Sequence, residues 1–118
     1  MNVYAIILVG VTFAAIGQIF WKLGMNQIGQ LTIPNLTALF TIMLNPFVLL
    51  GFILYGLGTI FWLIALSKKD LSFVYPFISL TYIIVLVLSS LVLKESIGVN
   101  KLIGTLIIVA GLIIIARS

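Results

Sequence analysis

Lys22 and Gln18 are the residues of this sequence with the clearest chemical potential. They lie four positions apart, at the end of a first apolar run that is free of charge over residues 1–21. Residues at i and i+4 share one face of a helix, so the Lys22 ammonium and the Gln18 amide would be neighbours. Such a pair suits an anionic headgroup, with Lys22 as counter-charge and Gln18 as hydrogen-bond donor. The alternative is that Lys22 simply extends along apolar surroundings until its ammonium reaches water.

A second polar set, formed by Tyr75, Ser79 and Tyr82, follows the i, i+4, i+7 spacing of one helical face. Two aromatic hydroxyls beside a serine hydroxyl suit a ligand that carries sugar or phosphate groups. Pro76 leaves the carbonyl one turn earlier without its helical partner, which predicts a local kink and an exposed acceptor. Tyrosine also anchors helices at membrane surfaces, and this second explanation remains open.

The composition decides which elements must carry these residues. Of the 118 residues, 64% are hydrophobic and only 7% are charged, whereas soluble domains carry about 25% charged residues. The charges leave long apolar runs at 23–67, 71–93 and 102–116, and such runs approach or exceed the ~20 residues that span a bilayer. The sequence therefore describes an integral membrane protein. A soluble enzyme is excluded, and no nucleic-acid partner is expected.

The pattern of the apolar runs decides between helices and a β-barrel, the two structures that satisfy backbone hydrogen bonds inside lipid. Barrel strands alternate apolar and polar residues, whereas 83–88 and 106–109 are continuously apolar. The expected fold is an all-α, single transmembrane domain over 1–118. Charges and helix-breaking residues place its four transmembrane helices at about 3–24, 46–67, 71–93 and 97–116.

The segment between the first two spans is expected to hold a short helix at the membrane interface. This helix covers about 34–44, begins at Pro34, a residue suited to a first helical position, and is mostly apolar. Asn45 is then expected to cap the second span. The alternative is that 34–44 forms the first turns of that span. Trp21 and Trp62, which are close to span ends, are expected to be interfacial anchors.

Catalysis and metal binding have few candidate residues. The sequence contains no cysteine and no histidine, so it offers no thiolate metal site and no imidazole base. Asp70 and Glu95 are the only acids, and both lie in short loops at span ends with no motif around them. We therefore expect no enzymatic activity, no metal and no cofactor.

The arrangement of charges and glycines bears on orientation and assembly. Three basic residues fall on each side of the membrane, which leaves the positive-inside rule without a preference. Four spans are too few to enclose a sizeable polar path, so at least two copies are expected to assemble. Gly104 and Gly111, seven residues apart, are expected to pack against another helix. Similar stripes, for which packing within one protomer is the alternative, occur at Gly10, Ala14, Gly17 and at Gly51, Tyr55, Gly58.

These residues resemble those of a known group of membrane proteins. Gly17 and Lys22 match the first helix of the small multidrug resistance family, within the drug/metabolite transporter superfamily, and Gly104-x6-Gly111 is similar to its dimerisation motif. Ala14, however, replaces the glutamate that couples those exporters to protons, and Ile78 replaces a tryptophan. The resemblance therefore implies the four-helix fold but not a proton-coupled cation antiporter.

A closer resemblance is to the paired small subunits that flip aminoarabinose-phosphoundecaprenol across the bacterial inner membrane. The shared motifs, which extend over nearly the whole chain, are Gly17-Gln18-x3-Lys22, Tyr75-Pro76-x2-Ser79-Leu80, Glu95 and the glycines of the fourth span. This resemblance implies a flippase or flippase subunit for an undecaprenyl-phosphate-linked sugar, working by alternating access of a homodimer or of a heterodimer with a similar small subunit. Lys22 would meet the phosphate of this lipid headgroup, while other membrane lipids surround the dimer. Phosphate or sugar would be met by Gln18, Tyr75, Ser79 and Tyr82.

Two other functions remain as alternatives. The first is an exporter of small cationic metabolites or drugs, although a cavity with Lys22 and no acid should repel cations. The second is an accessory subunit that packs beside a larger membrane enzyme and binds no substrate, which the glycine stripes fit equally well.

Overall fold

The computed structural model describes residues 2–31 and 35–118, and its regular structure there is entirely helical. Four helical segments are long and apolar enough to cross a membrane, which confirms the expected all-α, four-span fold. They are α1 (Val3–Ile28), α3 (Pro46–Lys68), the segment Leu71–Val92, and α6 (Val99–Ala116). The observed ends lie within four residues of the expected ones.

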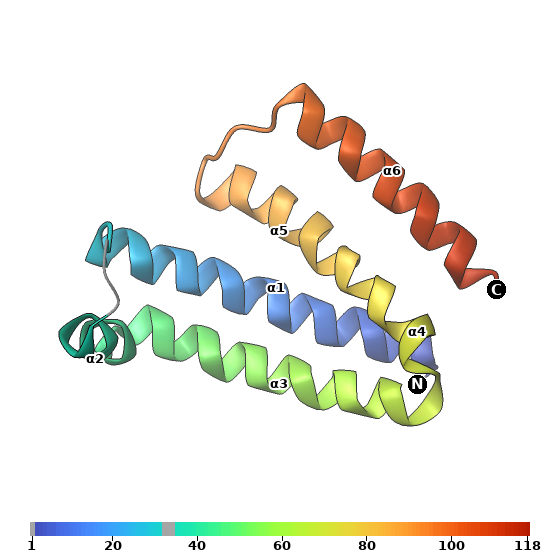
Figure 1. Cartoon of the computed structure of the whole chain (residues 1–118), viewed down its shortest axis with the longest axis horizontal. Helices are drawn as coiled ribbons and strands as arrows, with labels where there is room; N and C mark the ends of the chain where they lie inside the picture. Colours follow the sequence, from blue (N-terminus) through green and yellow to red (C-terminus); the bar gives the residue numbers. More distant parts are fainter. Residues whose placement is uncertain (1, 32–34) are drawn as a thin grey trace.

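The four spans lie side by side rather than around a central axis. Figure 1 shows α1 between α3 and the third span, with α6 on the outer side of the third span. The assembly is flat, with principal extents of 47, 36 and 23 Å. Both chain termini lie at the same end (Figure 1). The first span, α1, is the most buried of the four, because it lies between two neighbours and its backbone closely approaches that of α3.

The third span changes its winding near its beginning. Pro76 lies in the middle of a 3₁₀ turn, and the amide of Ile78 bonds to the carbonyl of Tyr75, which is the three-residue spacing of that turn. A proline has no N–H to donate, so tightening at this point costs the helix little. The span consists of α4 (Leu71–Val74), the 3₁₀ turn η1 (Tyr75–Phe77) and α5 (Ile78–Val92).

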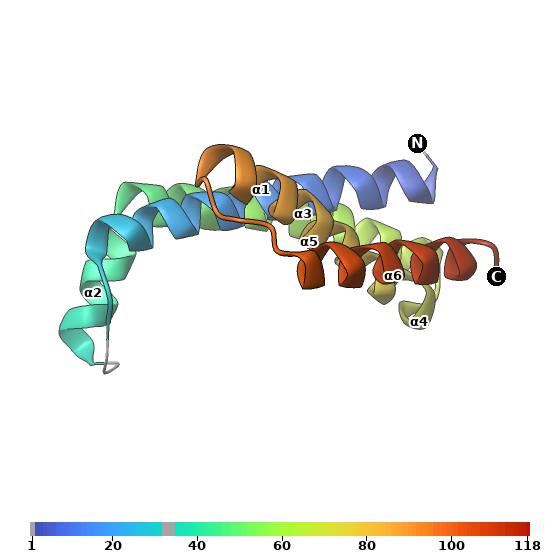
Figure 2. The same cartoon turned by 90° about the horizontal axis from the view of Figure 1, so that it is seen from above.

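The short helix α2 (Leu36–Leu44) is separate from α3, because Asn45 between them adopts an extended backbone with φ −70° and ψ 126°. The helix begins after Asn35; Pro34, the expected first residue, lies outside the described residues. Figure 2 shows α2 leaving the layer of spans at a steep angle. Its exposed apolar side chains, which suit a position at the membrane interface, are Leu36, Leu39, Phe40, Met43 and Leu44.

Asparagine side chains cap three of the helices. The side-chain Oδ1 of Asn2 accepts a hydrogen bond from the amide of Ala5 at 2.8 Å, and Oδ1 of Asn35 accepts one from the amide of Ala38 at 2.7 Å. Asn45 caps α3 by accepting from two amides, at 2.9 and 3.2 Å, just before the helix-initiating Pro46. Each cap satisfies donors that a helix start leaves without an intrahelical partner.

Replacing Asn45 with alanine is expected to destabilise the protein by about 1 kcal/mol or more. The variant loses the α3 cap and also the hydrogen bond from Asn45 Nδ2 to Gln27 Oε1, 3.1 Å long, which ties the end of α1 to α3. Thermal unfolding in detergent, followed by circular dichroism, measures the change. Asn100→Ala is the matched control, because the exposed Asn100 follows the start of α6 and makes no side-chain hydrogen bond within the described ranges. Equal melting of the two variants would contradict the capping role.

Two pairs of glycines hold α1 and α3 in backbone contact. A Cβ added at Gly58 would lie 2.6 Å from the carbonyl oxygen of Gly10, and one added at Gly17 would lie 2.7 Å from that of Gly51. Small residues allow helices to approach this closely in a membrane, where lipid is as apolar as the side chains. The stripes on these two spans therefore serve packing within one protomer.

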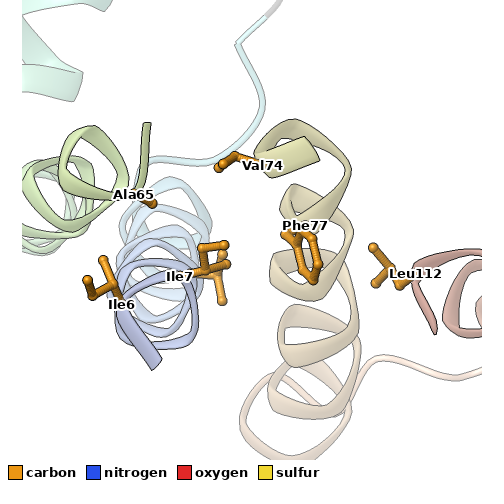
Figure 3. Close-up of a cluster of buried hydrophobic side chains, with 7 residues drawn as sticks. Ile6, Ile7, Ala65, Val74, Phe77 and Leu112 are labelled. Carbon is orange, nitrogen blue, oxygen red and sulfur yellow. The ribbon is translucent and has the colours of Figure 1, made fainter. Parts of the chain in front are cut away.

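A cluster of buried apolar side chains joins all four spans at the end that holds the termini. Figure 3 shows Phe77 standing between Ile7 of α1 and Leu112 of α6. The Tyr4 hydroxyl, from the first turn of α1, also donates a 3.0 Å hydrogen bond to the carbonyl of Ala116 at the end of α6. These contacts fix the outer helix α6 to the rest of the protomer.

Candidate functional site

A pocket of about 120 Å³ lies where α1, α3 and α5 meet. This volume is well above the ~15 Å³ that holds a single water, so a small ligand group fits. The pocket lies beside the glycine contacts of α1 and α3. Gly10, Ala14 and Gly58, which lie at these contacts, also line the pocket. It is lined by Gly10, Val11, Ala14, Gln18, Tyr55, Gly58, Thr59, Trp62, Ile78 and Thr81.

Aromatic rings of α3 supply two of the pocket walls. Tyr55 and Trp62 are seven residues apart, which places them on one face two turns from each other. The Tyr55 ring stacks on Trp21 of α1, with ring centroids 5.1 Å apart, so Trp21 holds the Tyr55 ring in place. A rigid ring with a polar tip can contact the apolar and the polar side of one ligand.

Besides the polar tips of Tyr55 and Trp62, two side chains of the pocket are free to bind a ligand. Gln18 is half-buried and Thr81 is buried, and in the described part of the chain neither side chain has a hydrogen-bond partner. The Thr59 hydroxyl is instead used within α3, where it donates to the Tyr55 carbonyl at 3.0 Å. An amide both donates and accepts, as does a hydroxyl, so Gln18 and Thr81 match the hydroxyls of a sugar.

No side chain that lines this pocket carries a charge at neutral pH. Lys22 is exposed and lies outside the lining, one helical turn beyond Gln18. One turn of helix is about 6 Å for four residues, so a ligand in the pocket can extend along α1 from Gln18 to Lys22. The site thus combines a neutral pocket with Lys22, which follows the pocket residue Gln18 by one turn of α1.

The tyrosine and serine set of the third span does not line this pocket. Tyr75 and Tyr82 are 57% and 39% exposed, Ser79 is half-buried, and the pocket is met instead by Ile78 and Thr81. Of the residues expected to bind a ligand, the structure brings only Gln18 into the pocket. Lys22 lies outside the pocket on α1, and Tyr75, Ser79 and Tyr82 form a separate face of the third span, open to lipid or to another chain.

The two tryptophans that were expected as interfacial anchors both have contacts within the protomer. Trp62 lines the pocket, and Trp21 packs on α3, where its indole ring meets Phe52 and Tyr55. The Trp21 Nε1 atom is buried and lacks a partner among the described residues, so it makes no bond to headgroups. The i, i+3, i+4, i+7 spacing of Tyr55, Gly58, Thr59 and Trp62 is the sequence pattern that marks this face.

The glycines of α6 have open surroundings. A Cβ added at Gly104 or Gly111 would meet nothing within 4 Å among the described residues of this chain. The contrast with the tightly packed glycines of α1 and α3 shows that this stripe has no packing role inside the described protomer.

Four apolar spans, three of which line a small pocket, are the architecture of a multi-pass membrane protein, and the family match gives its class. The model of the EamA-like transporter family matches residues 1–117, and the chain belongs to this family.

Curated relatives are similar over most of the chain. One, from Pseudomonas aeruginosa strain UCBPP-PA14, is 27% identical over 114 residues, which cover 97% of this chain and 96% of the relative. Another, from Proteus mirabilis strain HI4320, is 30% identical over 63 residues, or 53% of this chain and 56% of the relative. Both are named as probable 4-amino-4-deoxy-L-arabinose-phosphoundecaprenol flippase subunit ArnE. No solved structure matches the chain.

Proposed function

We propose that this protein is a flippase, or a subunit of one, that moves a polyprenyl-phosphate-linked sugar across the cytoplasmic membrane. The observation that carries the proposal is the juxtaposition on α1 of Gln18, inside a neutral pocket, with the exposed Lys22 one turn away. The names of the relatives, which are flippase subunits for a sugar-phosphate lipid, support it.

Each part of such a lipid has a matching part of the site. The sugar occupies the pocket, where Gln18 and Thr81 offer free hydrogen-bonding groups. The phosphate lies at Lys22, whose ammonium forms charge-assisted hydrogen bonds with phosphate oxygens. The polyprenyl chain stays in lipid beside the exposed face of Tyr75, Ser79 and Tyr82.

Movement across the membrane requires that the site opens to each side in turn. We propose that two protomers rock against each other, with the open glycine face of α6 at their interface. The partner is a second copy or a similar small subunit. The only two acids of the sequence, Asp70 and Glu95, lie at span ends, so no coupled proton is carried and the lipid gradient drives transport.

An exporter of cations is disfavoured by the same site. A cation in the pocket would lose its water and find neither a carboxylate among the lining residues nor relief from the nearby Lys22. The other alternative, an accessory subunit that binds no substrate, gives no role to the pocket or to its free polar groups.

Reconstitution tests the proposal. Liposomes that contain the purified chain, alone or together with the proteins that co-purify with it, are expected to move a labelled polyprenyl-phosphate sugar from the inner to the outer leaflet. Protein-free liposomes give the background rate, and a labelled lipophilic cation in the same vesicles tests the exporter. Background movement of the lipid in both preparations, or faster movement of the cation, would contradict the proposed function.

A further inference from the structure

The charge of the pocket restricts which sugar it accepts. We propose, on the basis of the proposed flippase function, that the headgroup is an uncharged sugar and that the site discriminates against an amino sugar. The contrast is with the amino sugar in the names of the relatives, 4-amino-4-deoxy-arabinose.

An ammonium group has no acceptor of opposite charge within the pocket. The lining residues are apolar, aromatic, amide or hydroxyl side chains. The two acids of the sequence are remote from it: Asp70 precedes Ile78 by eight residues, and Glu95 follows Thr81 by fourteen. At 1.5 Å of rise per residue, the eight residues from Asp70 to Ile78 span roughly 12 Å. Glu95 lies beyond the end of α5, and its amide bonds to the carbonyl of Ser89, which is eight residues, or roughly 12 Å of helix, from Thr81. An ammonium would find only neutral acceptors in the pocket, such as the Gln18 and Thr81 side-chain oxygens, and burying a charge without a counter-charge costs far more than burying a hydroxyl that forms hydrogen bonds.

Lys22 adds to this discrimination. Its ammonium, one turn from Gln18, holds the phosphate in the proposed complex and offers a sugar ammonium no counter-charge. A sugar hydroxyl, in contrast, is satisfied by the free Gln18 amide and the free Thr81 hydroxyl. The rings of Tyr55 and Trp62 then cover the apolar face of the sugar.

The sharpest test compares two ligands that differ in one group. One probe is a short-chain polyprenyl phosphate linked to arabinose; the other carries 4-amino-4-deoxy-arabinose, in which an ammonium replaces one hydroxyl. Binding of each to the full chain in nanodiscs is measured by calorimetry. We expect the arabinose lipid to bind at least about tenfold more tightly.

A carboxylate placed in the pocket should reverse this preference. Ala14 lines the pocket and is half-buried, so Ala14→Glu supplies the missing counter-charge. We expect this variant to bind the amino sugar lipid at least about tenfold more tightly than the unmodified protein does. Ala14→Gln has nearly the same size without the charge and is expected to keep the original preference, which separates charge from steric effects.

The outcomes distinguish this inference from the function on which it rests. Equal or tighter binding of the amino sugar lipid by the unmodified chain would overturn the selectivity and leave the flippase proposal intact. Failure of both lipids to bind, in a preparation that keeps its helical content, would overturn both. Tighter binding of the arabinose lipid supports the inference even if Ala14→Glu does not fold.

Discussion

Gly58→Val is expected to prevent α1 and α3 from packing and to leave little folded protein. A Cβ at this position would lie 2.6 Å from the Gly10 carbonyl oxygen and 3.1 Å from the Ala14 amide nitrogen, and backbone atoms cannot rotate away. Overpacking a well-fitted interior costs about 1–3 kcal/mol, and valine adds two methyl groups to that Cβ. The fraction of monodisperse protein after detergent extraction and its thermal melting measure the effect.

Gly56→Val is the matched control for this experiment. Gly56 lies two residues away on the same helix, and an added Cβ there meets nothing within 4 Å among the described residues. The substitution introduces the same side chain with the same helix propensity, so it should leave yield and melting nearly unchanged. If the two variants behaved alike, the close backbone contact between α1 and α3 would be wrong.

Lys22→Ala is expected to lower the rate of lipid movement by at least about tenfold while leaving the protein folded. The side chain is exposed and lies outside the buried cluster, so its removal leaves the packing intact. Its ammonium is the charge nearest along the chain to the pocket residue Gln18, and a charge-assisted hydrogen bond to phosphate is worth an order of magnitude or more in affinity. Reconstituted liposomes with a labelled polyprenyl-phosphate sugar give the measurement.

Two further variants isolate the role of this charge. Lys22→Arg keeps a cation at the same place and is expected to retain most of the transport, since arginine also pairs with phosphate. Lys101→Ala removes an exposed basic residue from the first turn of α6, away from the pocket, and is expected to have no effect. Undiminished transport by a well-expressed Lys22→Ala protein would contradict the phosphate-binding role of Lys22.

Local features of the fold could be predicted from sequence because local chemistry determines them. Asn45 followed by Pro46 has the side chain of a cap and the fixed φ of a first helical residue, and the structure places α3 just after it. The spans followed from hydrophobicity and length. The 3₁₀ turn at Pro76 was expected only as a kink, because the winding of a helix depends on neighbouring packing as well as on a missing amide.

The pocket was harder to predict because lipid removes the usual pattern. In water a helix shows its buried face by its apolar residues, but a span that meets lipid is apolar on every side. The polar stripe of Tyr75 and Tyr82 was therefore the most visible face of the third span, whereas Ile78 and Thr81 meet the pocket. The role of Trp62 was equally ambiguous, since a tryptophan near a span end can be an interfacial anchor or can line a pocket.

The asparagine caps make the starts of α1, α2 and α3 insensitive to a fall in pH. A carboxylate cap stabilises a helix only while it is ionised, so its contribution is lost as the pH falls through its pKa. The amides of Asn2, Asn35 and Asn45 have no proton to gain in that range, and Asp70, which precedes α4, makes no side-chain capping bond. These three helices therefore keep their capping bonds on whichever face of the membrane they begin, however acidic the water there.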